Sequence, residues 1–226
     1  MMNGSVRIGM EMPDFEAVTT QGPINFKEFK KNKWCVFFSH PGDFTPVCTT
    51  EFIAFSRACQ YFDERNTCLL GLSVDSNASH LAWLYNIYQN TGIKIPFPVI
   101  ADRDASIARK FGMISPEVDN TKTVRNVYII DENDIIRAIL IYPLTIGRSI
   151  PEILRIIDAL QTVDSDNVVT PANWLPGNPV IVPPPQTIEE LYNRVSNPCD
   201  LNCMDWYLCF KQDNINSNET SNNINT

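Results

Sequence analysis

The feature that most restricts the fold of this chain is an apolar run that leads within a few residues into a helix. Residues 34–38, Trp-Cys-Val-Phe-Phe, are continuously apolar and rich in strand-forming side chains, as in a strand buried on both faces. Pro41 and Gly42 end this run, and Pro46 suits the first position of a helix because its missing N–H costs nothing there. The sequence therefore predicts an α/β fold with a buried strand.

The rest of the chain repeats this alternation. A second apolar run precedes a predicted helix that a glycine closes. Two later apolar runs joined by a polar turn predict a hairpin, and an amphipathic helix follows it. The predicted segments are a strand at 69–74, a helix at 78–90 closed by Gly92, a short helix that Asp102 caps, strands at 127–130 and 135–142, and a helix after 149. Residues 1–33 form an N-terminal extension.

One cysteine, Cys48, occupies a chemically distinctive position. With Thr45 at the N-cap, Cys48 falls in the first helical turn, where free backbone N–H groups and the helix dipole favour a thiolate. Most free cysteines instead fill cores. Core packing is our interpretation of Cys35, in the strand, of Cys59, on the apolar helix face, and of Cys68.

The residues around Cys48 resemble a known signature. Residues 39–51, Ser-His-Pro-Gly-Asp-Phe-Thr-Pro-Val-Cys-Thr-Thr-Glu, are similar to the active-site motif of the peroxiredoxins (AhpC/TSA family), specifically their one-cysteine-type group. The similarity continues through segments such as 72–76, 97–102, 123–129 and 142–148, and covers roughly residues 5 to 185. It implies a thioredoxin-like fold and a thiol-dependent peroxidase that reduces hydrogen peroxide and organic hydroperoxides.

The resemblance also assigns catalytic roles. Cys48 matches the peroxidatic cysteine, which becomes a sulfenic acid. Thr45 matches the residue that hydrogen-bonds the thiolate and the peroxide, and Pro41 matches the residue that shields the sulfur. Arg125 matches the arginine that keeps the thiolate ionised and stabilises charge on the leaving oxygen.

Three further residues are expected beside the substrate. Arg148 matches a second active-site arginine, and Glu51, one helical turn after Cys48, is placed to orient an arginine. His40 aligns with the histidine beside the pocket, and a purely structural histidine is the alternative. Neither a metal nor an organic cofactor is expected.

The C-terminal part of the chain differs in composition. Its prolines indicate an extended arm, which in the resembling group wraps a partner subunit. We expect a thioredoxin-like peroxidase domain at 5–162, a C-terminal dimerisation arm at 163–210 and a disordered Asn-rich tail at 211–226. A homodimer, extending to a decamer ring of dimers, is the expected assembly.

Cysteines in this arm supply a second chemical hypothesis. Asn197 and Pro198 are placed to open a short helix that would carry Cys199 and Cys203, and a disulfide within the segment would require the helix to unwind. The segment 203–209 resembles the C-terminal cysteine pair of archaeal-type members. Cys203 or Cys209 is thus the expected resolving cysteine, with a thioredoxin-like or other dithiol reductant as partner. A zinc site and incidental cysteines are the alternatives.

Charge and composition exclude several other classes. The formal net charge is −8 with no basic run, which disfavours nucleic-acid binding. No apolar stretch is long enough to span a bilayer and no signal peptide is recognised, so a cytoplasmic location is expected. The absence of a Cys-x-x-Cys disfavours a disulfide exchanger, and the absence of serine at 31–35 disfavours lipase activity. A peroxide sensor and a chaperone-like assembly remain as alternatives.

Overall fold

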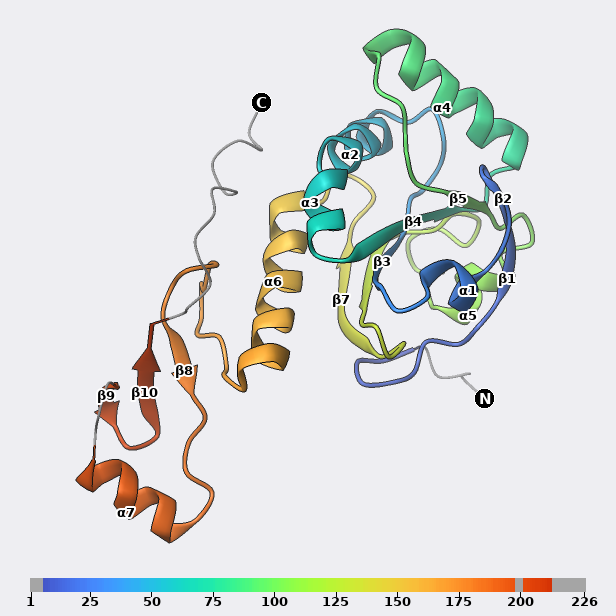
Figure 1. Cartoon of the computed structure of the whole chain (residues 1–226). Helices are drawn as coiled ribbons and strands as arrows, with labels where there is room; N and C mark the ends of the chain where they lie inside the picture. The colour runs from blue at the N-terminus through green and yellow to red at the C-terminus, as the bar shows by residue number, and fades with distance from the viewer. Residues whose placement is uncertain (1–5, 198–200, 213–226) are drawn as a thin grey trace. The chain divides into compact units, whose positions relative to one another are not determined.

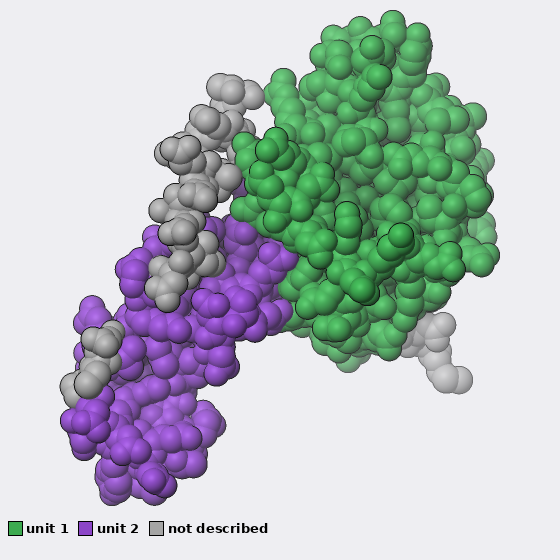
Figure 2. Space-filling view, in the orientation of Figure 1, with its two compact units in different colours: residues 1–150 green, residues 151–226 purple. Residues whose placement is uncertain are grey.

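The computed structural model describes residues 6–197 and 201–212. They form two compact units, an N-terminal unit of residues 1–150 and a C-terminal unit of residues 151–226 (Figure 2).

The N-terminal unit is built on one sheet of seven strands in the order β2-β1-β5-β4-β3-β6-β7 (Figure 1). The strands are β1 (Glu16–Thr19), β2 (Gly22–Asn25), β3 (Trp34–Ser39), β4 (Thr67–Ser73), β5 (Val99–Ala101), β6 (Arg125–Ile130) and β7 (Ile136–Tyr142). The helices are α1 (Phe26–Lys30), α2 (Pro46–Arg57), α3 (Cys59–Glu64), α4 (Asn77–Thr91) and α5 (Ser106–Lys110). This mixed α/β arrangement confirms the thioredoxin-like fold expected from the sequence.

Strand β3 lies inside the sheet and is buried along its whole length. It pairs in parallel with β4 and antiparallel with β6, so that Phe37 lies between Leu70 and Tyr128. Parallel pairing of β3 and β4 requires a crossover, which α2 and α3 provide. The sheet therefore fixes where α2 begins, immediately after the end of β3.

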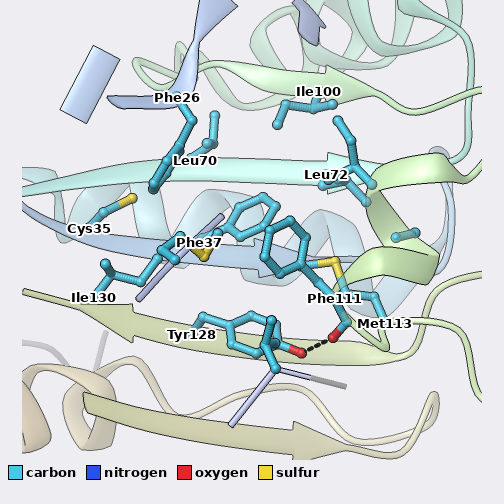
Figure 3. Packing of buried hydrophobic residues seen from close by; sticks show 14 of the residues in the cluster. Phe26, Cys35, Phe37, Leu70, Leu72, Ile100, Phe111, Met113, Tyr128 and Ile130 are labelled. Carbon is cyan, nitrogen blue, oxygen red and sulfur yellow. Dashed lines mark hydrogen bonds between the residues drawn. The ribbon is translucent and has the colours of Figure 1, made fainter. Parts of the chain in front are cut away.

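Both faces of β3 are packed with aromatic side chains. On one face Phe37 makes an edge contact with Phe111 at a centroid distance of 5.6 Å and also packs against Tyr128. Figure 3 shows this cluster, including the hydrogen bond from the Tyr128 hydroxyl to the Phe111 carbonyl oxygen. On the other face Phe38 stacks on Phe55 of α2 at 4.4 Å. This two-sided burial anchors the strand that leads into residues 40–45. We call these residues the catalytic loop, because the predicted site residues His40, Pro41 and Thr45 lie on it.

Local sequence signals define the remaining elements as predicted. Gly92 closes α4 in the left-handed conformation with φ of 73°, where glycine carries no Cβ penalty. The Asp102 carboxylate accepts hydrogen bonds from the backbone N–H groups of Ile107 and Ala108 at the start of α5. Strands β6 and β7 form the expected hairpin.

The C-terminal unit contains two helices and a small sheet. Its elements are α6 (Ile150–Asp166), which starts at the unit boundary, β8 (Val180–Val182), α7 (Ile188–Ser196), β9 (Asn202–Asp205) and β10 (Leu208–Lys211). The sheet order is β8-β10-β9, and a small apolar cluster is formed by Val168, Trp174 and Val180. Helix α7 begins with a capping box between Thr187 and Glu190.

The predicted helix that would carry Cys203 is wrong. Residues 202–211 form the hairpin β9–β10, in which Cys203 pairs with Cys209 across the strands. Since facing residues of an antiparallel pair bring their Cβ atoms close together, the two sulfurs form a disulfide that a regular helix would not allow. Pro198 and Cys199 lie outside the described residues.

Two further expectations concern the ends of the chain and membranes. Of the predicted tail 211–226, Lys211 of β10 pairs with Val180 and Gln212 Nε2 donates to the Gly177 carbonyl oxygen at 2.9 Å. Residues 213–226 lie outside the described residues. Within the described part of the chain, no helix is both long and apolar enough to cross a membrane.

Candidate active site

Cys48 lies in the first turn of α2, as the sequence predicts. Helix α2 begins at Pro46 with Thr45 at the N-cap in an extended conformation, and the Cys48 side chain is completely buried. The Thr45 hydroxyl does not cap the helix. It donates instead to the carbonyl oxygen of Gly42 at 2.8 Å, a bond within the loop between β3 and α2.

Arg125 provides the direct partner of this sulfur. Its Nη1 lies 3.3 Å from Cys48 Sγ and donates to Glu51 Oε2 at 2.6 Å. The other guanidinium nitrogens, Nε and Nη2, both donate to the carbonyl oxygen of Leu144. Because Arg125 starts β6, which pairs with β3, the sheet carries the guanidinium to the N-terminus of α2. Four hydrogen bonds leave it little freedom to move.

Glu51 joins both predicted arginines. Arg148 donates from Nε to Glu51 Oε1 at 2.8 Å and from Nη2 to Oε2 at 2.7 Å, a bidentate pair. The backbone N–H of Arg148 also donates to Oε1. A further contact places the Arg148 guanidinium over the Phe38 ring, 4.9 Å from its centroid. The turn that follows β7 is thereby fastened to α2.

The charged side chains beside Cys48 do not balance one another. Glu51, Arg125 and Arg148 are 3%, 2% and 7% exposed, so water screens them little. Two guanidinium groups and one carboxylate leave one excess positive charge, and Cys48 Sγ lies at the guanidinium that carries it. Reactive cysteines are typically found in positively charged surroundings of this kind.

The two histidines of the chain meet at one carboxylate beside this cluster. Asp43 Oδ1 lies 3.0 Å from His40 Nε2, and His80 Nδ1 lies 2.9 Å from Asp43 Oδ2. Burial raises the pKa of Asp43, but the hydrogen bonds with His40 and His80 outweigh it and leave this pKa well below its usual range. Burial lowers the pKa of His40, and Asp43 offsets part of that effect. Asp43 is thus an ionised acceptor.

The hydrogen bonds of His80 constrain its protons. Its Nε2 faces the Ile100 carbonyl oxygen at 3.1 Å, while its Nδ1 faces the ionised Asp43. Both partners are acceptors, so both bonds form only if both ring nitrogens carry a proton. His40 Nδ1, by contrast, is buried without a partner among the described residues. His40, Asp43 and His80 form the one candidate metal-ligand group in the described part of the chain, and within it both histidine rings contact the Asp43 carboxylate directly.

Sequence reasoning placed Cys48, Thr45, Pro41, Arg125, Arg148, Glu51 and His40 at the site, and the structure brings all seven into the N-terminal unit. It did not identify Asp43 and His80 as members. No local signal joined them, since His80 falls inside the predicted helix 78–90 and Asp43 lies in the loop before the first predicted helix. Their shared contact depends on α4 lying beside the catalytic loop, which no local pattern encodes.

The remaining cysteines fall into two groups. Cys35 is fully buried in β3 beside Cys68 of β4, and burial followed by a hydrogen bond with Cys68 raises its pKa. Burial likewise raises the pKa of Cys59 to about 11, so these thiols suit packing. In the C-terminal unit Cys203 is exposed, whereas Cys209 is buried. The zinc alternative needed both as thiolates, and the structure joins them in a disulfide.

Comparisons with known protein families identify two regions. Residues 8–139 match the AhpC/TSA family, and residues 159–196 match the C-terminal domain of 1-Cys peroxiredoxin. Peroxiredoxin 2 of Caldanaerobacter subterraneus subsp. tengcongensis is 60% identical over 206 residues, covering 91% of this chain and 93% of that protein. A peroxiredoxin of Aquifex aeolicus is 50% identical over 216 residues, with coverage of 91% and 96%.

Solved structures give the same result. A yeast mitochondrial 1-Cys peroxiredoxin superimposes with a TM-score of 0.82 at 40% identity, covering 92% of this chain and 100% of that one. A peroxiredoxin 6 of Arenicola marina gives a TM-score of 0.83 at 34% identity, with coverage of 92% and 98%. With its buried cysteine at a helix N-terminus facing an arginine, the chain belongs to the peroxiredoxins and is a thiol peroxidase of the AhpC/TSA family.

Proposed function

We propose that Cys48 is the residue that reduces peroxide. The observation that carries the proposal is the 3.3 Å contact between Cys48 Sγ and Arg125 Nη1 in the first turn of α2. The site has one excess positive charge when the sulfur is neutral. An anionic sulfur with fixed donors around it is what attack on an O–O bond requires.

The chemical step balances with the groups present. The Cys48 thiolate attacks the terminal oxygen of ROOH, the S–O bond forms and the O–O bond breaks. The sulfur is oxidised to a sulfenic acid, and RO⁻ leaves and takes a proton to become water or an alcohol. Arg125 stabilises the negative charge as it passes from sulfur to the leaving oxygen.

The remaining residues position these two groups. Since the Thr45 hydroxyl donates its proton to Gly42, its oxygen is available to accept a hydrogen bond from the hydroperoxide. Buried Pro41 keeps water from the sulfur. Glu51 and Arg148 hold Arg125 in place, and His40 supplies a further polar contact on the loop.

Resolution of the sulfenic acid is assigned to the C-terminal hairpin. We propose that Cys209 of a partner subunit condenses with the Cys48 sulfenic acid, releasing water, and that Cys203 then attacks Cys209. This exchange frees Cys48 and leaves the Cys203–Cys209 disulfide seen in the structure. Exposed Cys203 is the sulfur that a thioredoxin-like or other dithiol reductant can reach.

The proposal requires a homodimer, and two surfaces support one. Helix α7 exposes Ile188, Tyr192 and Val195 along one face, each more than 60% exposed, a stripe that needs an apolar partner. Strand β7 is the last strand of its sheet and exposes Ile141. A ring of dimers, up to a decamer, uses further surfaces of the same subunit.

Three finer points complete the proposal. Hydrogen peroxide and alkyl hydroperoxides are the substrates. A cytoplasmic, reducing compartment suits the four unpaired cysteines found among the described residues. Residues 5–162 form the peroxidase domain and residues 163–210 the dimerisation arm.

Stopped-flow peroxide consumption tests the central role of Cys48. Cys48→Ser should reduce the second-order rate constant for hydrogen peroxide at least a thousandfold, while Cys59→Ser, which removes a half-buried thiol of the next helix, should leave it unchanged. A Cys48→Ser chain that consumes peroxide like the wild type would refute the proposal. A wild-type chain that reacts once and never turns over with dithiols would favour the peroxide sensor.

Nonreducing electrophoresis after one equivalent of peroxide tests resolution. Cys203→Ser should accumulate a covalent dimer joined by Cys48 and Cys209, because the exchange step is blocked. Cys209→Ser should remain monomer-sized with a trapped sulfenic acid. The reverse pattern would assign resolution to Cys203, and monomer-sized bands in both variants would exclude intersubunit resolution.

A further inference from the structure

A cavity of about 620 Å³ opens beside the catalytic loop of the N-terminal unit. One wall is the loop itself, including Pro41 and Thr45, the residues proposed to shield and bind the peroxide. The facing wall comes from the segment that leads into α5 and from the segment before β6, with Arg103, Arg109 and Lys122. A molecule in this cavity would therefore contact the loop that leads into the helix carrying Cys48.

The three cationic side chains of the cavity keep most of their donors free. Arg103 is exposed and has no hydrogen bond or ion pair with another described residue. Arg109 uses Nη1 alone, toward the Asp104 carbonyl oxygen at 2.7 Å. Lys122 Nζ lies 4.0 Å from Asp119 Oδ2, beyond hydrogen-bond distance.

The carboxylates of the same lining are already engaged. Asp43 faces His40 and His80, and Asp75 Oδ2 accepts from the Asp43 backbone N–H and from the Ser73 hydroxyl, each at 2.9 Å. Asp104 Oδ1 accepts from the backbone N–H of Ser106. The acidic groups are thus held by internal hydrogen bonds, while the cationic groups have donors to offer a ligand.

We infer that this cavity binds the carboxylate of a small anionic molecule whose reactive group reaches Cys48. Guanidinium groups are suited to carboxylates because they present paired donors in one plane. In a chain of net charge −8, a local cluster of free cations is the feature that can offset general repulsion of an anion. The inference rests on the proposed function of Cys48 and adds a substrate class to it.

Two kinds of molecule share this chemistry. One is a hydroperoxide that carries a carboxylate, which would bind before Cys48 is oxidised. The other is a small carboxylate-bearing thiol, which would attack the sulfenic acid afterwards. The cavity should favour the carboxylate-bearing hydroperoxide and the carboxylate-bearing thiol over their uncharged analogues. Separate measurements distinguish the hydroperoxide from the thiol.

The first measurement follows oxidation of Cys48. Rate constants for Cys48 oxidation are determined with 4-hydroperoxy-4-methylpentanoate, with its methyl ester and with hydrogen peroxide. The chains compared are wild type, Arg103→Gln and Arg103→Gln/Arg109→Gln. The control is Lys94→Gln, which removes a cation near Tyr88. We expect the wild type to prefer the acid over the ester by about tenfold, and the single variant to lose about three- to fivefold of that preference. The double variant should lose it entirely. Lys94→Gln should retain it, and all chains should consume hydrogen peroxide equally.

The second measurement follows reduction of the sulfenic acid. In chains carrying Cys203→Ser and Cys209→Ser, 3-mercaptopropionate and 2-mercaptoethanol are compared with and without the two arginine substitutions. If the arginine substitutions abolish only the preference for the acid over the ester, the ligand is a hydroperoxide. If they abolish only the preference for 3-mercaptopropionate over 2-mercaptoethanol, the ligand is a thiol.

The outcomes separate this inference from the proposed function. The anion site would be overturned if wild type and the double variant have the same ratios of rate constants, acid to ester and acid to alcohol. This holds even if hydrogen peroxide is consumed normally. Peroxide consumption that survives Cys48→Ser would instead overturn the proposed function on which the site depends.

Discussion

At the residue scale, the planar shape of the Arg125 guanidinium matters as much as its positive charge. Arg125 reaches Cys48, Glu51 and the Leu144 carbonyl oxygen with different nitrogens of one rigid plane. An ammonium group carries the same charge but presents its donors from a single atom. The position of Arg125 therefore requires a guanidinium.

Arg125→Lys should accordingly lower the rate of peroxide reduction about a hundredfold, although the positive charge is kept. Stopped-flow measurement of Cys48 oxidation provides the test, with urea unfolding to show that the variant is folded. Arg137→Lys is the matched control, because its guanidinium pairs with Asp131 away from Cys48. Equal rates for Arg125→Lys and wild type would show that charge alone matters.

His40 makes stability depend on pH. Because burial lowers the pKa of His40, the unfolded chain takes up a proton near pH 6.5 while the folded chain does not. The unfolded state then binds more protons, so this contribution to stability is present above about pH 6.5 and is lost as the pH falls. The loss is at most about 1.4 kcal/mol per pH unit.

His40→Gln should flatten this dependence, since the glutamine amide can still donate to Asp43 but does not titrate. Urea unfolding at pH 7.5 and pH 5.5 measures the free energy of unfolding for both chains. The difference between the two pH values should be smaller in His40→Gln. A wild-type chain that is equally stable at both values would contradict the argument.

At the element scale, α5 and β6 are joined by buried polar groups. The Tyr128 hydroxyl of β6 donates to the Phe111 carbonyl oxygen at the end of α5 (Figure 3). The same hydroxyl accepts a hydrogen bond from Asn126 Nδ2. Both partners are buried, so neither can turn to water if the hydroxyl is removed.

Tyr128→Phe should therefore lower the free energy of unfolding by about 1–3 kcal/mol, although it removes one atom. Denaturation in urea measures the change. Tyr88→Phe removes the hydroxyl of a tyrosine that is 39% exposed and should change stability by less than about 0.5 kcal/mol. Equal effects of the two substitutions would mean that the buried hydroxyl has no special role.

At the scale of the whole molecule, the C-terminal unit has little core of its own. The apolar cluster of Val168, Trp174 and Val180 is small, and α7 leaves its apolar stripe exposed. This stripe is the surface that the homodimer proposed above would bury.

Tyr192→Asp should weaken the dimer, because it places a charge at the centre of the stripe. Analytical ultracentrifugation should show a dissociation constant for the dimer raised at least tenfold. When combined with Cys203→Ser, the substitution should also reduce the amount of covalent dimer that forms after peroxide treatment. Asn193→Asp adds the same charge outside the stripe and should leave association unchanged. A dimer unaffected by Tyr192→Asp would place the interface elsewhere.

Local patterns predicted much of this molecule. The apolar run 34–38 became β3, Pro46 began α2, and Gly92 closed α4. These features depend on near neighbours in the sequence, so propensities and capping are sufficient to find them. The C-terminal helix prediction failed because the pairing of Cys203 with Cys209, and of β10 with β8, outweighs a local helix signal.

The sequence by itself placed Cys48, the proposed nucleophile, at a helix start, because Thr45, Pro46 and Cys48 lie within four residues of one another and a helix start needs no distant partner. Only the tertiary structure decided the electrostatics. Arg125 and Arg148 converge on Glu51 from positions 74 and 97 residues away, and Asp43 brings His40 and His80 together. Such contacts arise from the packing of α2 and α4 beside the sheet, since the strength of a buried charge depends on which other groups surround it.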